Sequence, residues 1–214
     1  DRLKQALGGE PCSEEFWALR NVDLEVRRGD TLGVIGRNGA GKSTFLQLVC
    51  GTLRPSAGTV TVNGRVAAML ELGSGFNPLF TGREKVMLGA AVLGLSAGEI
   101  RSRFARIEAF ADIGRFIDEP VRFYSSGMFA RLAFAVCAHV DADILIVDEI
   151  LAVGDTAFQQ KCMRFLHRFR QQGTLLFVSH DSQAVVRLCN KVLWLDHGEV
   201  RDYGDAREMV RRYH

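Results

Sequence analysis

Residues 36–43 read GRNGAGKS and directly follow the apolar run TLGVI at residues 31–35. They match the pattern GxxxxGK[ST] in full, and a helical pattern from about Gly41 to Cys50 follows them. Glycines in such a loop let the backbone amides turn inward around a phosphate, because a Cβ would obstruct them. A strand before the loop and a helix after it are the context that the motif requires. The stretch therefore predicts an α/β fold with a phosphate site at the end of a strand.

The phosphate loop also predicts individual roles. We expect the Lys42 ammonium group to reach the β- and γ-phosphates of ATP and the Ser43 hydroxyl to bind Mg²⁺. The helix that follows offers the positive end of its dipole to the same phosphates. The alternative, a glycine loop without a ligand, is disfavoured by the correct flanking elements. The nucleotide-binding residues predicted here are Gly36, Asn38, Gly39, Ala40, Gly41, Lys42, Ser43 and Thr44.

Composition narrows the class of protein. The 214 residues are 47% hydrophobic, which is enough to bury one substantial core. Apolar runs fall well short of the roughly 18 residues that cross a bilayer. The start, DRLKQALGGEP, lacks the apolar core of a signal peptide, and we expect that the true N-terminus is missing.

The 27 basic and 25 acidic residues are mixed along the chain, so we expect no nucleic-acid partner. The five cysteines form no CxxC pair, and we expect reduced thiols.

Strands alternate with helices along most of the chain, which predicts one domain over residues 1–214 with a mainly parallel sheet. The turn signal Asn63-Gly64 joins GTVTVNG and RVAAMLEL, and we expect this hairpin to add a small antiparallel β layer. Residues 82–138 read as a helical subdomain with a capping box at Ser96 and Glu99. Other expected elements are strands at 17–26, 31–35, 144–147 and 175–179, helices at about 126–138 and from 156, and a strand, a turn at His197-Gly198, a strand and a basic helix from 191 onward.

The run ILIVDE is an apolar strand that ends in Asp148 and Glu149. A carboxylate at the C-terminal end of a buried strand beside a phosphate loop is placed to hold the Mg²⁺ shell, which is the role expected of Asp148. Glu149 could then polarise the attacking water as the catalytic base. Alone, such a pair would be read as a cap or a surface pair. Up to this point a kinase or any phosphate-loop ATPase would fit.

The segment YSSGM, residues 124–128, decides between these classes. Placed just before the carboxylate strand, it resembles the signature sequence of ABC ATPases, usually LSGGQ, and the resemblance extends over nearly the whole chain. It implies the ABC ATPase fold of the phosphate-loop NTPases, with Ser125, Ser126 and Gly127 contacting the γ-phosphate held by a second copy of the chain. Tyr124, Ser126 and Met128 depart from the usual string, and the serine is small enough to be tolerated.

The resemblance implies further site residues. LAVGD at 151–155 looks like the loop in which Asp155 crosses the dimer interface, and His180 looks like the switch histidine that senses the γ-phosphate. The glutamine that normally links Mg²⁺ to the permease is absent, and Glu71 is the nearest candidate; its alternative role is an ordinary strand-end glutamate. In this family the adenine-stacking aromatic usually belongs to a first strand, which we expect to be missing from this sequence. We expect Phe16 and Trp17 to be poor substitutes.

ELGSGFNPLFTGRE, YSSGMFARLAFAV and LAVGDTAFQQKC resemble the polysaccharide-exporting group of ABC ATPases, which serve O-antigen of the Wzt type, capsule and teichoic acid. The resemblance implies a homodimer that pairs with a membrane permease dimer and drives a lipid-linked glycan outward, from the cytoplasmic face of the bacterial inner membrane. Many members continue into a carbohydrate-binding domain, whereas this sequence stops at His214, so we expect either a fragment or a short member. Export of a drug or a lipid is the alternative. ABC-like DNA clamps are excluded by the missing coiled coil, and tandem translation-factor ATPases by the single cassette.

Overall fold

A six-stranded sheet forms the centre of the molecule, with strands in the order β2-β3-β4-β1-β5-β6. The computed structural model describes residues 16–69, 77–148, 155–179 and 181–214. Within these ranges every neighbouring strand pair is parallel except β5 with β6, which is antiparallel. The mainly parallel sheet predicted from the sequence is confirmed. The strands are β1 (Thr31–Ile35), β2 (Val66–Ala68), β3 (Ile144–Val147), β4 (Thr174–Val178), β5 (Lys191–Asp196) and β6 (Glu199–Asp205).

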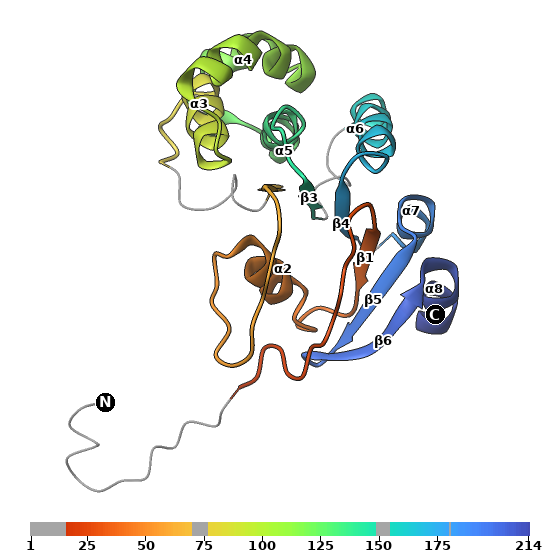
Figure 1. The fold of residues 1–214 in the computed structure, drawn as a ribbon. Helices are drawn as coiled ribbons and strands as arrows, with labels where there is room; N and C mark the ends of the chain where they lie inside the picture. The colour runs from red at the N-terminus through yellow and green to blue at the C-terminus, as the bar shows by residue number, and fades with distance from the viewer. Residues whose placement is uncertain (1–15, 70–76, 149–154, 180) are drawn as a thin grey trace, which may run out of the picture.

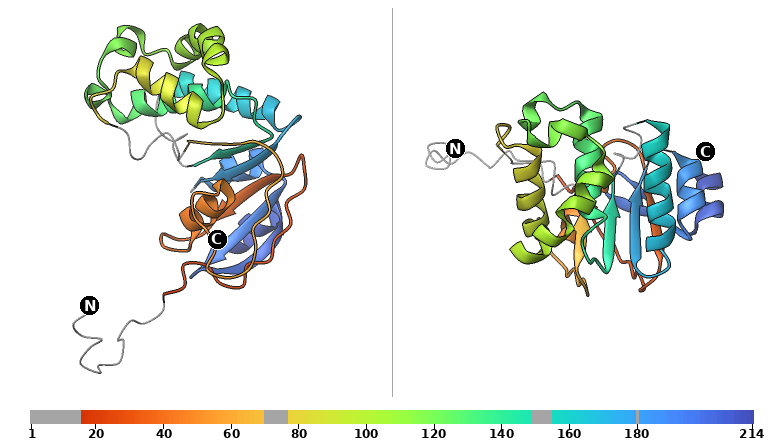
Figure 2. Two further views of the ribbon diagram at one scale, coloured as in Figure 1. Left: turned by 60° about the vertical axis from the view of Figure 1, so that its left-hand side comes forward. Right: turned by 90° about the horizontal axis from the view of Figure 1, so that it is seen from above.

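Helices cover both faces of the sheet, and three of them form a lobe beyond its β2–β3 edge (Figures 1 and 2). Helix α2 (Lys42–Cys50) packs on one face, and α7 (Ser182–Leu188) and α8 (Ala206–Tyr213) lie on the other. The lobe contains α3 (Gly82–Val92), α4 (Ala97–Ala111) and α5 (Ser126–Cys137), with the short 3₁₀ helices η2 (Gly114–Asp118) and η3 (Val121–Phe123). Helix α6 (Thr156–Phe169) lies between the lobe and the sheet's far face.

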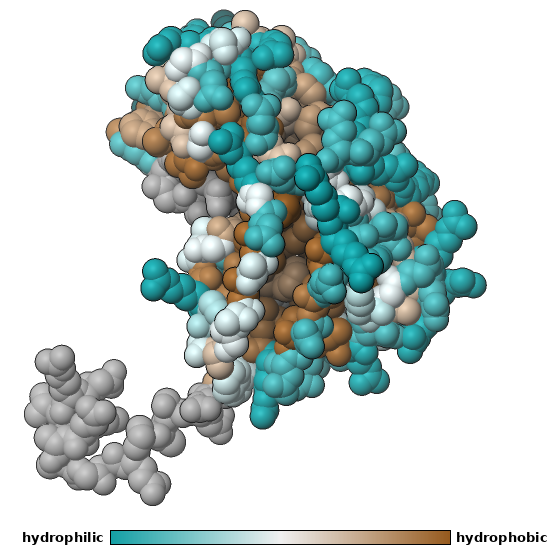
Figure 3. Space-filling model, viewed as in Figure 1, coloured by the Kyte–Doolittle hydropathy of each residue, from teal (hydrophilic) through white to brown (hydrophobic). Residues whose placement is uncertain are grey.

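Two apolar clusters hold these layers together. Leu32 and Val34 of β1 pack with Phe45 and Leu46 of α2 on one face of the sheet. The larger cluster joins the other face to α6, α7, α8 and the helical lobe. Figure 3 shows hydrophobic residues gathered in a hollow in the middle of one side of the molecule, while the surface over the helices is mostly hydrophilic. Because β1 is buried on both faces, its position in the sheet is strongly specified.

Local signals explain where the lobe's helices begin. Thr81 and Glu84 form a capping box at α3, and Ser96 and Glu99 form one at α4. In each capping box, the hydroxyl of the N-cap residue accepts a hydrogen bond from the N3 backbone amide, and the N3 glutamate side chain accepts one from the N-cap backbone amide. Two amides at the helix start that would otherwise lack an acceptor are thus satisfied. The capping box predicted at Ser96 is confirmed.

The hairpin expected at Asn63-Gly64 does not form. Residues 59–63 carry no strand, and Val66–Ala68 pairs in parallel with β3 instead. The Arg65 amide donates to the Asp143 carboxylate over 2.9 Å, and the Arg65 carbonyl accepts from the Asp143 and Ile144 amides. These bonds tie the start of β2 to β3, so the turn dipeptide does not govern the pairing.

The strand expected at residues 17–26 is also wrong. No strand is assigned there, although side chains from Asn21 to Val26 alternate between exposed and half-buried. Leu24 and Val26 pack against the α2 cluster. An extended segment with one side packed on a core shows the same apolar–polar alternation as a strand. The alternation in this segment therefore reflects the burial of alternate side chains and not hydrogen bonding to a neighbouring strand.

Candidate functional site

The glycine-rich loop between β1 and α2 is held in a conformation that only glycine fits. A Cβ at Gly36 would lie 2.3 Å from the Leu195 carbonyl oxygen. At Gly41, where φ is +100°, a Cβ would lie 2.7 Å from the Ala18 carbonyl oxygen. Side chains at either position would push the loop off its neighbours. The sequence GxxxxGK therefore reflects close backbone packing on two sides of the loop.

Helix α2 begins without a side-chain cap. Its N-cap is Gly41, and no acidic residue lies in its first turn. Each of the other α-helices within the described ranges has a capping side chain: Thr81, Ser96, Ser125, Asp155, Asp181 or Asp205. The first amides of α2 are thus left for an external acceptor, and the helix dipole favours an anion there.

Lys42 curls back over the loop. Its Nζ donates to the Gly36 carbonyl over 2.8 Å and to the Arg37 carbonyl over 3.1 Å. This places the ammonium group on the loop's inner side, where it adds positive charge to the open end of α2.

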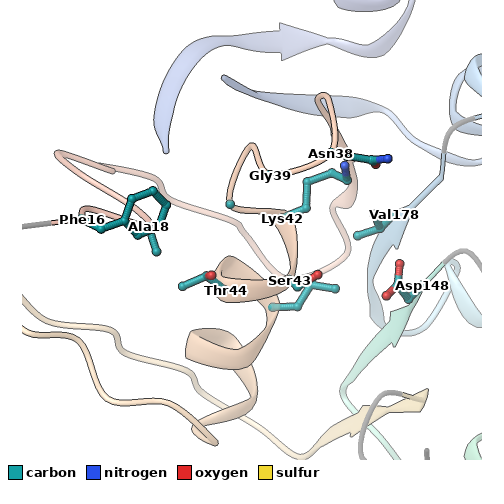
Figure 4. Close-up of a pocket in the computed structure, with 11 residues that line it drawn as sticks. Phe16, Ala18, Asn38, Gly39, Lys42, Ser43, Thr44, Asp148 and Val178 are labelled. Carbon is teal, nitrogen blue, oxygen red and sulfur yellow. The ribbon is translucent and has the colours of Figure 1, made fainter. Parts of the chain in front are cut away.

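A cavity of about 400 Å³ opens in front of this helix start. Figure 4 shows Asp148 and Val178 at one end of it, Lys42 and Ser43 in the middle, and Phe16 and Ala18 at the other end. The cavity is large enough for a small organic ligand. Its lining residues are Phe16, Ala18, Asn38, Gly39, Gly41, Lys42, Ser43, Thr44, Leu46, Asp148 and Val178.

The oxygen donors of this cavity fit Mg²⁺. The Ser43 hydroxyl and the Asp148 carboxylate come from the start of α2 and the end of β3, and both line the same cavity. Mg²⁺ prefers one or two protein oxygens, with phosphate and water completing the octahedron. Among the described residues no group of three or more His, Cys, Asp or Glu could hold a metal by itself. A Mg²⁺ that arrives with a nucleotide therefore suits the donor set.

The predicted signature residues lie outside this cavity. Ser125 is the N-cap of α5, and its Oγ accepts from the Met128 amide over 3.2 Å. Ser125 and Ser126 are exposed at the start of a helix in the lobe, and Gly127 is half-buried. The structure thus does not bring them to the phosphate loop of their own chain.

Asp155 is bound within its own chain. Its Oδ1 accepts from the Phe158 amide over 2.8 Å as the cap of α6, and its Oδ2 pairs with Arg131 of α5. The Arg131 guanidinium also lies 5.0 Å above the Phe158 ring. Sequence reasoning missed Arg131, because its partner is 24 residues away and no local pattern marks the contact.

Three predicted residues lie outside the described ranges: the base Glu149, the switch histidine His180 and the Mg²⁺ candidate Glu71. The neighbours of Glu149 and His180 are described: Asp148 follows β3, Ser179 follows β4, and Asp181 caps α7. Phe16 was expected to be a poor partner for a base, yet it lines the cavity. The only sequence signal for Phe16 is that it stands two residues before Ala18, whose carbonyl oxygen lies close to the phosphate loop.

Four of the five cysteines lie in the described residues, and they form no disulfide with one another. Cys137, Cys162 and Cys189 are buried and Cys50 is half-buried. Burial raises the pKa of Cys162 and of Cys189 to about 12. None of the described helices is both long and apolar enough to cross a bilayer.

Fold and cavity together define a phosphate-loop nucleotide-binding protein. The chain belongs to the ABC transporter family, because the model of that family, described as "ABC transporter", matches residues 19–152. ABC cassettes bind ATP or ADP and hydrolyse ATP, and this chain is an ATPase of that kind.

Similar curated proteins indicate which members of the family this chain resembles. The chain is 51% identical to "ABC transporter protein AbcA" of Aeromonas salmonicida over 99% of this chain and 69% of that protein. It is 49% identical to "O-antigen export system ATP-binding protein RfbB" of Klebsiella pneumoniae over 93% of this chain and 81% of that protein. Among solved structures, a dimeric post-hydrolysis state of the ATP-binding cassette MJ0796 bound to ADP and Pi matches with a TM-score of 0.79 at 23% identity, over 92% of this chain and 95% of that one.

Proposed function

We propose that this chain is the ATP-hydrolysing subunit of an ABC exporter that moves a lipid-linked, O-antigen-like polysaccharide across the bacterial inner membrane. The observation that carries the proposal is its 49% identity to an O-antigen export ATP-binding protein over 81% of that protein. The subunit would lie on the cytoplasmic face of the membrane, held there by its permease. An exporter of a drug or a lipid is the alternative.

In this proposal the cavity holds ATP. Lys42 and the free amides of α2 bind the β- and γ-phosphates, while Ser43 and Asp148 hold Mg²⁺. When bound, Mg²⁺ offsets negative charge on the phosphates. Glu149 directly follows Asp148 and polarises the attacking water as a general base. His180, after β4, hydrogen-bonds the γ-phosphate.

A complete site needs a second copy of the chain. Ser125, Ser126 and Gly127 stand at an exposed helix start outside their own chain's cavity, which suits residues that contact a nucleotide across an interface. The matched cassette MJ0796 is a dimer. Asp155 would take part at the same interface, with Arg131 fixing its carboxylate from within.

Apolar side chains on the lobe support a permease partner. Leu79, Leu88 and Val92 lie on or just before α3 with 55%, 39% and 53% of their surface exposed. Exposed apolar residues on one helix are typical of a docking surface. We propose that residues 73–85 and α3 receive the permease, with Glu71 linking this contact to Mg²⁺; residues 73–76 and Glu71 lie outside the described ranges.

A charge placed on this surface tests the docking. Leu79→Glu should leave a folded, ATP-binding subunit that no longer co-purifies with its permease, because the exposed leucine contributes little to the core. Val60→Glu, at a site 44% exposed in the segment before β2, is the matched control and should co-purify normally. Normal co-purification and transport by the Leu79 variant would refute the docking surface.

The cargo is tested in cells that carry the chain with its permease. Replacement of the wild type by Glu149→Gln should stop surface display of the glycan and leave lipid-linked glycan inside the inner membrane. Normal glycan display together with a lost drug resistance or a changed lipid distribution would instead support the alternative cargo.

A further inference from the structure

The turn between β5 and β6 lies directly against the nucleotide cavity. It consists of His197 and Gly198, with φ of +47° and +81°, as a two-residue hairpin turn requires. The Gly198 amide donates to the Ala40 carbonyl of the phosphate loop over 3.2 Å. The Gly198 carbonyl accepts from the Arg20 amide over 2.7 Å. One residue of the hairpin thus joins the phosphate loop to the segment 17–20.

Gly198 and Gly41 hold this segment from two sides. A Cβ on Gly198 would lie 2.9 Å from the Ala18 carbonyl oxygen and 3.0 Å from the Trp17 carbonyl oxygen. A Cβ on Gly41 would lie 2.7 Å from the same Ala18 oxygen. The neighbours are backbone atoms, which cannot turn aside as a side chain can. The position of Ala18 therefore depends on the absence of a side chain at both glycines.

Ala18 and Phe16 form the end of the cavity that lies farthest from Asp148 (Figure 4). Lys42 and Ser43 stand between the two ends. A ligand whose phosphates meet Lys42, Ser43 and Asp148 can extend along the cavity toward Phe16 and Ala18. Phe16 and Ala18 of the segment 16–20 thus form the wall on which the nucleoside part of the ligand would rest.

We infer that Gly198 is a positioning residue for the nucleoside end of the ATP site: it holds the segment 16–20 against the phosphate loop. The inference rests on the proposed binding of ATP in this cavity. A side chain at 198 would displace the wall but would keep both backbone hydrogen-bonding groups of the turn, so the phosphate loop would keep its bond to the hairpin. Binding energy from the nucleoside would fall, and binding of the phosphates would stay.

Gly198→Ala tests this, with Gly29→Ala as the matched control. Gly29 has φ of +84°, close to that of Gly198, but a Cβ there meets nothing within 4 Å. The two variants therefore share the backbone strain of alanine at positive φ and differ in the clash with segment 17–20. The purified full chain is titrated with ATP and, separately, with inorganic tripolyphosphate, both with Mg²⁺, and KM and kcat for ATP are measured.

We expect Gly198→Ala to bind ATP about fivefold to tenfold more weakly, the size of a lost hydrogen bond or a comparable close contact. Tripolyphosphate affinity should equal that of the wild type, KM for ATP should rise, and kcat at saturating ATP should hold. Gly29→Ala should bind both ligands like the wild type. Equal ATP affinity in the two variants, or an equal loss for ATP and tripolyphosphate in Gly198→Ala, would overturn the inference.

Two further outcomes are separated. If the wild-type chain fails to bind ATP, the proposed function itself is refuted. If the wild type binds ATP and Gly198→Ala shows no selective loss, only the inference about Gly198 is refuted. Where Gly198→Ala does not fold, Arg20→Pro perturbs the same contact from the other side, because proline lacks the amide that donates to Gly198. It should show the same selective loss of ATP, and unchanged ATP affinity in a folded Arg20→Pro protein would refute the inference.

Discussion

Two helix starts in this molecule carry sequences that we expect to bind phosphate, and they are built differently. Helix α2 begins at a glycine with no side-chain cap, beside a cavity that Phe16, Ala18, Asp148 and Val178 also line. Helix α5 begins at Ser125, which already caps its own helix, and its first residues are exposed. The start of α2 lines a cavity within its own chain, whereas the start of α5 is exposed and could contact a second chain.

This difference between the two helix starts predicts that ATP binding and ATP hydrolysis have different requirements. ATP binding should belong to the single chain, because the described residues that line the α2 cavity include none from α5. Hydrolysis should need both starts, with α5 supplied by the second copy. Substitutions at the two helix starts should therefore have different signatures.

The largest effect is expected at Glu149. Glu149→Gln removes the polarising base and leaves Lys42, Ser43 and Asp148 in place, so ATP should still bind while hydrolysis falls by about 10²–10⁴-fold. The undisturbed γ-phosphate should trap the dimer, which sedimentation with ATP and Mg²⁺ detects. Glu199→Gln, at an exposed position on β6, is the control. Monomers only, or hydrolysis near the wild-type rate, would contradict the role of Glu149.

Lys42→Ala should act on the first helix start alone. A charged hydrogen bond to phosphate contributes about 1.5–3 kcal/mol, so ATP affinity should fall by roughly ten- to a hundredfold. Lys161→Ala is a matched control, because Lys161 also donates to two backbone carbonyls, at Ala109 and Phe110, away from the cavity. Fluorescent ATP that binds both variants equally well would refute the assignment.

Ser125→Ala should act on the second start and leave ATP binding by the single chain intact. Loss of the cap should cost about 1 kcal/mol of stability, and hydrolysis should fall further than that loss explains because the hydroxyl is missing from the partner's site. Ser96→Ala removes the equivalent cap at α4 and controls for stability. Equal hydrolysis in the two variants, measured well below their melting temperatures, would show that Ser125 is only a cap.

The features that could be predicted from the sequence are those with local signals. The phosphate loop has its glycines, lysine and serine within eight residues, and the Ser96–Glu99 capping box lies within one turn. The buried strands 31–35 and 144–147 are short apolar runs with the predicted bounds.

Features that depend on distant contacts could not be predicted. The Asn63-Gly64 signal favoured a hairpin, but Asp143, some 80 residues later, binds the Arg65 backbone and fixes a parallel pairing. Phe16 lines the cavity beside Ala18, whose carbonyl oxygen lies within 3 Å of the place that a Cβ on Gly41 or Gly198 would take. His197-Gly198 was predicted as a turn, but nothing near it in the sequence points to Ala18.

The smallest effect is expected at Tyr124, the residue before the signature serine. Its hydroxyl donates to the Phe116 carbonyl over 2.5 Å, and it packs so closely on α3 that a Cβ at Gly82 would lie 2.0 Å from it. Tyr124→Phe should cost about 0.5–1.5 kcal/mol of unfolding free energy near neutral pH, the net value of one hydrogen bond. ATP binding should not change, and hydrolysis should change little, because Ser125 keeps its cap.

This variant also has a pH signature. Burial, together with Asp118 and Glu119, raises the pKa of Tyr124 to about 12 from an ordinary value of 10.0. Because the folded-state pKa lies above the unfolded one, the unfolded chain loses this proton first, and the wild type loses stability as pH rises from 10 toward 12. Phenylalanine does not titrate, so the stability difference between the two proteins should be constant below pH 10 and shrink above it. Urea unfolding across this range measures the difference, with Tyr203→Phe as the control, since the Tyr203 hydroxyl donates to the Glu25 carbonyl over a longer 3.4 Å. A difference that stays constant through pH 11 would show that the hydroxyl beside the signature helix is not held in its neutral form by burial.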